Sequence, residues 1–185
     1  MHKIIAILLS SMSTMAVCQP GGDHSFEFLQ LPAHARLSAL GGVNVSLADK
    51  EVNFFLSNPS LVGDTLNGSV SAGYQFYLAG IGNALFSAAY DVPEIGQLML
   101  GIQHLDYGTI HGFDPSGVET MDYASAETAL ALGKSHQVGN MRFGVVLKGV
   151  FSNIAGYRAS ALVADLGGIF KHPHRDFTAG LAIKN

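Results

Sequence analysis

The stretch that decides the fold is Ser69-Val70-Ser71-Ala72-Gly73-Tyr74-Gln75-Phe76-Tyr77-Leu78. Every second position from Val70 to Leu78 is apolar or aromatic, and most positions between them are small or polar. Successive side chains of a β-strand point to opposite faces, so a period of two predicts a strand with one apolar face. The same alternation returns in 142–152 and in 176–184.

Seven segments with this alternation follow one another along the chain. Each is nine to twelve residues long, close to the roughly 9–11 residues of a tilted membrane strand and longer than an average globular strand. Such lengths favour a transmembrane β-barrel. The predicted strands are 69–78, 83–91, 96–107, 125–135, 141–152, 160–171 and 175–185.

The connectors between the predicted strands alternate in length. Outer-membrane barrels have short periplasmic turns and longer external loops, so the first strand is expected to leave the periplasm. The loop around 114–117 is then external. The short connectors are 91–95, 136–140 and 172–174, whereas 107–124 is long and 153–159 is intermediate. Aromatic residues near strand ends suit the girdles at the two membrane interfaces: Phe76, Tyr77, Tyr90, Tyr107, Phe151, Tyr157 and Phe170.

The composition also points toward lipid. Charged residues make up 13% of the chain, against roughly 25% in an average soluble protein, and the mean hydropathy is +0.29. A net charge of −4 provides no basic surface for nucleic acid. A soluble β-sandwich would explain the alternation almost as well, but strand length, low charge and an export signal favour the barrel.

Residues 1–18 have the pattern of a signal peptide. Lys3 precedes an apolar stretch, and Ala16-Val17-Cys18 fits a small-x-small cleavage site. A membrane anchor is the alternative, but the apolar part is shorter than the roughly 20 residues of a helical span. Cys18 also allows a lipoprotein, although Val17 is bulky for such a site. If Cys18 is removed, the mature chain has no cysteine for disulfides or metal.

Residues 19–68 lack sustained alternation and are predicted to form an N-terminal lumen or plug segment. Pro32 to Leu40 can begin a short helix that Gly41-Gly42 ends, and Asn58-Pro59 reads as a turn. Irregular backbone is unstable against lipid, so this segment is expected inside the lumen or outside the membrane. Strand parity predicts three lumen-facing charges: Lys148, Asp165 and Lys184.

Residues 26–42, FEFLQLPAHARLSALGG, resemble the N-terminus of the PorV/PorQ group, outer-membrane proteins associated with type IX secretion in Bacteroidetes. Further similarity lies at 106–108, 112–114, 125–127, 147–148, 160–167 and 180–185, so it covers nearly the whole mature chain. The residues that carry the family motif are Phe26, Leu31, Pro32, Arg36, Ala39, Leu40, Gly41, Gly42, Asn58 and Pro59.

The resemblance implies an all-β, antiparallel, FadL-like transmembrane barrel of about fourteen strands, with a short irregular or helical segment in its lumen. Members of the group are longer, so 69–185 is expected to be the first seven strands of a truncated barrel. The resemblance also implies a non-enzymatic role in the bacterial outer membrane, in export or surface attachment of cargo. Its expected partners are other type IX components, exported cargo proteins and outer-membrane lipid.

The sequence contains no recognisable catalytic motif. There is no Gly-x-Ser-x-Gly elbow, Ser-x-x-Lys, His-Glu-x-x-His or phosphate-binding glycine loop, so no catalytic residue and no cofactor are assigned. His172-Pro173-His174 could share a metal, but no third ligand is near, and no metal site is predicted. Arg36 is expected to pair with Asp49 or Glu51, with a ligand role as the alternative.

Two other functions stay open. One is a FadL-like transporter of hydrophobic compounds, which requires an apolar pocket between residues 26–61 and the barrel wall. A protein-binding scaffold should fill that space instead. The other is an outer-membrane hydrolase, whose nucleophile would have to lie outside this chain.

Overall fold

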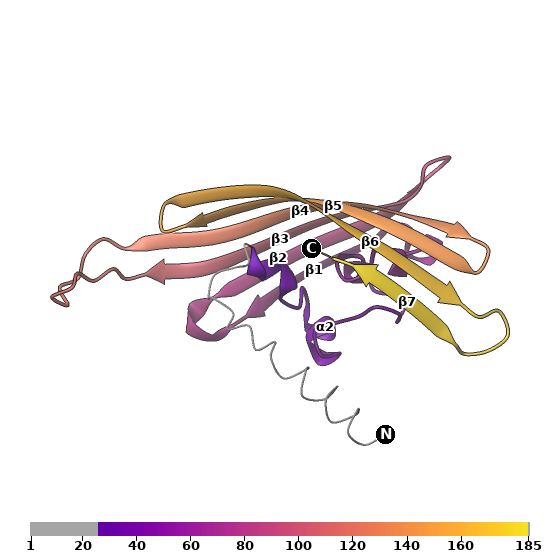
Figure 1. Cartoon of the computed structure of the whole chain (residues 1–185), viewed down its shortest axis with the longest axis horizontal. Coiled ribbons are helices and arrows are strands. Elements are labelled where there is room, and N and C mark those ends of the chain that lie inside the picture. Colours follow the sequence, from indigo (N-terminus) through magenta and orange to yellow (C-terminus); the bar gives the residue numbers. More distant parts are fainter. Residues whose placement is uncertain (1–25, 185) are drawn as a thin grey trace, which may run out of the picture.

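The computed structural model describes residues 26–184, so the predicted signal peptide and its cleavage site lie outside the described residues. Within this range, seven strands form one antiparallel sheet in sequence order, with β1 and β7 at its edges (Figure 1). This confirms the predicted antiparallel β-structure. The strands are β1 (Ser69–Phe76), β2 (Gly82–Val92), β3 (Gly96–Ile110), β4 (Tyr123–Val138), β5 (Met141–Ile154), β6 (Tyr157–Lys171) and β7 (Thr178–Ile183).

The hairpin between β3 and β4 is longer than the sequence predicts and extends past the rest of the sheet (Figure 1). Its register shifts between Asp106 and Thr109, and an isolated bridge joins Phe113 to Glu119 near the tip. The Asp114 carboxylate accepts hydrogen bonds from the backbone N–H groups of Ser116 and Val118, at 2.8 and 2.9 Å. The strands therefore extend into both ends of the predicted loop 107–124, and residues 111–122 remain a loop with one isolated bridge.

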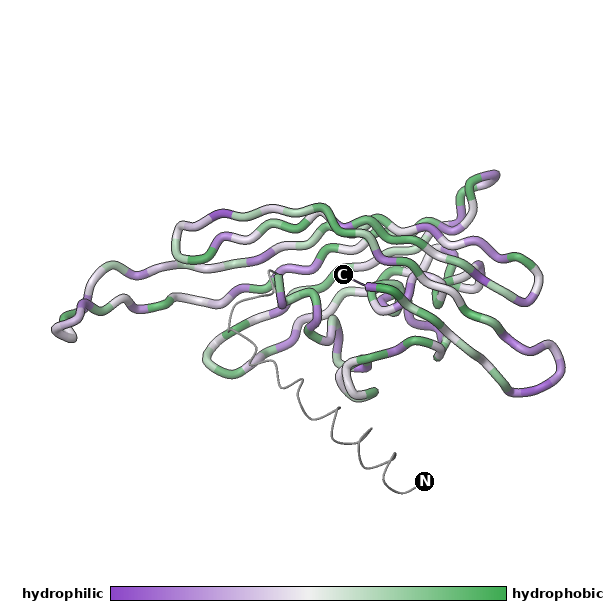
Figure 2. Tube along the Cα trace, in the orientation of Figure 1, coloured by the Kyte–Doolittle hydropathy of each residue, from purple (hydrophilic) through white to green (hydrophobic). Residues whose placement is uncertain are grey.

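The convex face of the sheet exposes apolar side chains, whereas the concave face buries polar side chains among apolar ones. Large apolar side chains are exposed on the convex face, and Figure 2 shows their alternation with polar residues along the strands. The central ones are Val70, Phe86, Leu100, Ile102, Leu130, Leu132, Leu147, Leu162 and Leu166. Polar side chains are buried on the concave face: Asn83, Ser87, Gln97, Gln103, Ser125, Glu127, Ser135, Lys148 and Asp165.

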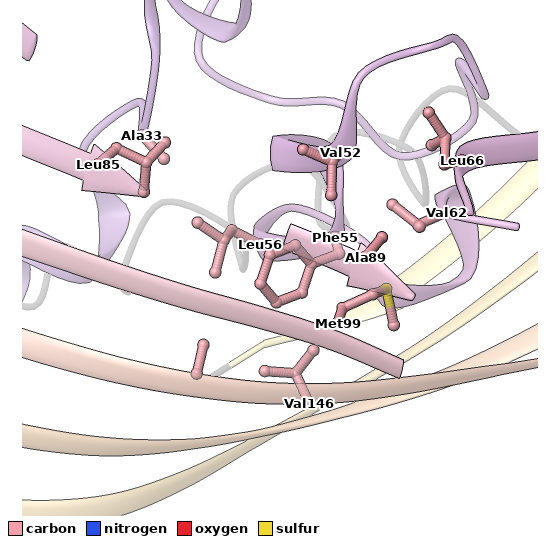
Figure 3. Close-up of a cluster of buried hydrophobic side chains, with 11 residues drawn as sticks. Ala33, Val52, Phe55, Leu56, Val62, Leu66, Leu85, Ala89, Met99 and Val146 are labelled. Atoms are coloured by element: carbon pink, nitrogen blue, oxygen red, sulfur yellow. The ribbon is translucent and has the colours of Figure 1, made fainter. Parts of the chain in front are cut away.

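The N-terminal segment lies along the concave face (Figure 1). Val52, Phe55 and Leu56 pack against Met99 and Val146 of the sheet in one buried cluster (Figure 3). No helix among residues 26–184 is long and apolar enough to cross a bilayer. The elements of the segment are η2 (Glu27–Gln30), α2 (Ala35–Ala39), η3 (Val52–Leu56), η4 (Pro59–Leu61) and η5 (Asp64–Leu66), and η6 (Leu78–Gly80) links β1 to β2.

Two of the aromatic residues assigned to the interfacial girdles face the other way. Tyr77 and Tyr107 pack on the concave side against the cluster that contains Phe28 and Leu105. The Tyr107 hydroxyl donates a hydrogen bond to Glu127 Oε2 at 2.5 Å. The prediction was wrong for these two because an aromatic residue at a strand end can lie on either face. Four others are exposed: Phe76, Tyr90, Phe151 and Tyr157.

Candidate interaction site: the N-terminal segment in the concave face

The first part of the site is α2 and the two glycines that end it. Gly41 and Gly42 have φ values of +85° and +84°, a left-handed conformation that side chains with a Cβ rarely adopt. The Gly42 N–H donates to the Leu37 carbonyl at 2.9 Å, which closes the last turn. Leu37 is buried against Phe54, Leu61 and Ile169. This short helix therefore anchors the segment to β6 through one side chain.

Arg36 forms an ion pair with Asp49, one of the two partners considered from sequence. Glu51 instead accepts hydrogen bonds from Asn53, from the backbone N–H at 3.2 Å and from Nδ2 at 2.7 Å. The Lys50 backbone N–H donates to Asp49 at 2.6 Å, and with Arg36 it lowers the pKa of the Asp49 carboxyl. The pair joins α2 to the loop before η3, so Arg36 has a structural contact here.

The remaining motif residues before Gly41 divide into two groups. Phe26 and Leu31 are half-buried and pack against the cluster around Phe28. The Pro32 carbonyl accepts a long hydrogen bond of 3.5 Å from the Tyr77 hydroxyl. Ala39 and Leu40 are exposed, so they contribute little to the packing of this segment against the sheet.

Asn58 connects the N-terminal segment to the last strand. Its Oδ1 accepts from the Ser60 backbone N–H at 3.0 Å and from the Ser60 hydroxyl at 2.6 Å. Its Nδ2 donates to the Val45 carbonyl at 2.7 Å and to the Leu181 carbonyl of β7 at 3.2 Å. The side chain is fully buried, so these four bonds replace the water that it loses on folding.

Glycines on the concave face give the segment space to approach the strands. A Cβ on Gly144 would lie 2.4 Å from the Pro59 carbonyl carbon, and one on Gly167 would lie 1.9 Å from Asn58 Oδ1. A Cβ on Gly180 would lie 2.1 Å from the Val45 carbonyl oxygen. These contacts are shorter than real Cβ contacts, so the segment can approach β5, β6 and β7 at these three positions only because each is glycine.

The predicted lumen charges lie beneath this segment. Lys148 and Asp165, on β5 and β6, are buried and form an ion pair. Lys184 directly follows β7, and its side chain lines the same small cavity as Lys148 and Gln103. Gln103 Nε2 is buried and has no hydrogen-bond partner. The cavity is therefore polar on its sheet side.

No group of three metal-ligating side chains is found among residues 26–184. The two histidines considered for a shared metal are in the β6–β7 turn, with ring centroids 6.4 Å apart. The His174 backbone N–H donates to His172 Nδ1 at 3.1 Å, so that nitrogen already has a partner.

No protein-family model matches the chain, and no curated protein matches it. Sequence reasoning did not identify Gly144, Gly167 and Gly180 as docking positions. Their alternation placed them within strands, but their proximity to residues 45–60 depends on long-range contacts that no local pattern contains.

Proposed function

We propose that this chain forms part of the wall of an outer-membrane β-barrel and acts as a PorQ-like, non-enzymatic component of the type IX secretion system. Export or surface attachment of cargo proteins is the activity we assign to it. The observation that carries the proposal is the row of large apolar side chains exposed on the convex face, opposite a concave face that buries an ion pair and several polar side chains among apolar ones. Outer-membrane barrels have this arrangement.

The two edges of the sheet also support a membrane barrel. β1 and β7 each pair with only one other strand in the described part of the chain. Unpaired backbone groups cost several kcal/mol each in lipid, which is why membrane sheets close. We propose that further strands pair with these edges and complete a FadL-like barrel around the N-terminal segment.

Two features favour protein binding over transport. The N-terminal segment fills the middle of the concave face, where Phe55 and Pro59 contact the strands directly. The β3–β4 hairpin exposes Phe113, Val118 and Met121, each more than 60% accessible. An ordered hairpin with exposed apolar side chains suits contact with another protein.

One feature favours the transporter reading as a second candidate. An open, mostly apolar groove lies between η2 and the ends of β1 and β3. Its lining includes Phe28, Leu31, Tyr77, Ile81 and Leu105. A hydrophobic compound entering from the hairpin side could occupy this groove. The functional test must therefore also detect bound hydrophobic compounds.

The barrel is tested by placing a charge on the convex face. Leu132 is 58% exposed near the middle of β4. In lipid, Leu132→Arg should lower the free energy of unfolding by about 2–4 kcal/mol. On a water-facing surface, the same change should stay within about 0.5 kcal/mol. Urea titration of the protein in lipid vesicles, followed by its heat-modifiable gel band, measures the difference.

Val138→Arg is the matched control for this substitution. Val138 is exposed at the end of β4, where the cost of arginine falls to about 0–1 kcal/mol near the interface. Equal, negligible effects at both positions would contradict a lipid-facing sheet.

The function is tested by purifying the tagged protein, expressed from its own gene, from outer membranes of its native host. Mass spectrometry should recover other type IX components or surface cargo. A variant with Phe113→Ser, Val118→Ser and Met121→Ser should lose them, whereas Leu78→Ser, at the neighbouring β1–β2 connector, should retain them. A clean barrel that carries hydrophobic compounds and no protein partner would favour the transporter.

A further inference from the structure

We infer that one small monovalent anion, of the size of chloride, binds in the cavity between the N-terminal segment and the concave face of the sheet. The inference goes beyond the proposed function, because it depends only on residues 26–184 and not on a partner protein. Three observations carry it: a buried donor without a partner, an excess of positive charge and the size of the space.

The cavity lies between an apolar wall and a polar one. Leu37 of α2 and Leu56 of η3 are among the apolar side chains that the N-terminal segment contributes. The strands contribute Gln103 of β3 and Lys148 of β5, and Lys184 lines the cavity from the end of β7. Polar groups that are buried against apolar side chains need partners to replace the water that they lose. A ligand of this cavity is therefore held from its sheet side.

Gln103 and Lys148 have hydrogen-bond donors to offer to such a ligand. Gln103 is 6% exposed, and its Nε2 has no hydrogen-bond partner. Lys148 is also buried and donates a hydrogen bond to the Asp165 carboxylate. An ammonium group has three N–H donors, so Lys148 can donate to a second acceptor. Since buried donors are nearly always paired, these two side chains require an acceptor inside the cavity.

The charges around the cavity favour an anion over water as that acceptor. No acidic residue lines the cavity in the described part of the chain. Asp165 neutralises one of the two lysines, which leaves one positive charge over. A buried excess charge is costly unless an opposite charge accompanies it. Lys184 is more exposed than Lys148, so water screens part of the excess, and a single negative charge is enough to balance the rest.

The size of the space restricts the anion. The centre of a water-sized sphere can move within about 20 Å³ of it. One bound water needs at least about 10–15 Å³ by the same measure, so the cavity holds one water or one ion of slightly larger radius. Chloride meets this limit, whereas phosphate, the head of a fatty acid with its chain, or gluconate does not. Chloride and gluconate therefore form a test pair.

The test uses the protein expressed from its own gene and purified in mild detergent. Urea titrations, followed by intrinsic fluorescence, are compared in sodium chloride and in sodium gluconate at equal ionic strength. Chloride should raise the urea midpoint of the protein. The equilibrium constant for unfolding should fall about tenfold when the chloride concentration is ten times its dissociation constant. If chloride gave no increase over gluconate at any concentration, the cavity would hold only water and the anion site would be wrong.

Three variants separate binding in the cavity from general effects of the two salts. Gln103→Leu replaces the unpaired donor by an apolar group of similar size and should abolish the chloride effect. Lys184→Met should weaken it, whereas Lys171→Gln, which removes an exposed lysine of β6, should leave it unchanged. An equal chloride effect in all three would place the anion elsewhere and overturn the inference. Should Gln103→Leu fail to fold, crystals of the unmodified protein grown in bromide decide. An anomalous peak beside Gln103 Nε2 supports the site, and no peak there contradicts it.

Discussion

Gly144→Ala should destabilise the folded protein by about 1–3 kcal/mol, and Gly144→Val should prevent the N-terminal segment from docking. The new Cβ would lie 2.4 Å from the Pro59 carbonyl carbon, 2.6 Å from its oxygen and 2.7 Å from the Ser60 nitrogen. All three are backbone atoms, so no flexible side chain can move aside. Proteolysis within 52–62, which is buried in the folded protein, should become rapid in the valine variant.

Gly149→Ala is the control on the same strand. Its Cβ would point to the convex face, with Phe151 as the nearest neighbour at 3.7 Å, an ordinary contact distance. Urea midpoints of the two alanine variants should therefore differ, with Gly149→Ala close to the unmodified protein. If both alanines were tolerated equally, the close approach of Pro59 to β5 would be wrong.

Asp165→Leu should lower the free energy of unfolding by about 3–5 kcal/mol, because it leaves the buried Lys148 ammonium without its partner. Lys148 is 4% exposed, so bulk water does not solvate its ammonium group. The nearby Lys184 adds a like charge. The effect is measured by urea titration in lipid vesicles, and it should be the largest of any single substitution at the predicted lumen charges.

The double variant Lys148→Met with Asp165→Leu separates the ion pair from its surroundings. Replacing both partners by apolar residues of similar size is often neutral, because the desolvation cost of both charges disappears. Most of the loss in Asp165→Leu should therefore be recovered. A double variant as unstable as the single one would mean that Asp165 acts through its other contacts.

The period-two pattern was sufficient to predict the seven strands, because the burial of alternate residues is a local property of each strand. Strand ends were less predictable. The β3–β4 hairpin continues to Ile110 and Tyr123, since cross-strand hydrogen bonds persist there without any apolar face. Tyr77 and Tyr107 could be placed near strand ends but not on the correct face, because an aromatic residue at a strand end can lie on either face.

Contacts between distant parts of the chain could not be predicted from the sequence. Parity could assign Lys148 and Asp165 to one face, but only the register between β5 and β6 brings them together. It pairs Lys148 with Val163 and Asp165 with Val146, so the charged side chains meet diagonally. The sequence analysis considered Asp49 and Glu51 as partners of Arg36, and the path of the loop before η3 selects Asp49.

The hydrogen bond from Asn58 to Leu181 spans 123 residues, and this separation sets the order of assembly. Each strand pairs with its predecessor, so hairpins can form one after another from the N-terminal end of the sheet. The segment around Asn58 is delivered first, yet its docking surfaces on β5, β6 and β7 are completed last. Phe55 can pack early against Leu85 and Met99 of β2 and β3, but Asn58 cannot dock fully until β7 is in place. Full docking of this segment is therefore completed only after β7 has joined the sheet.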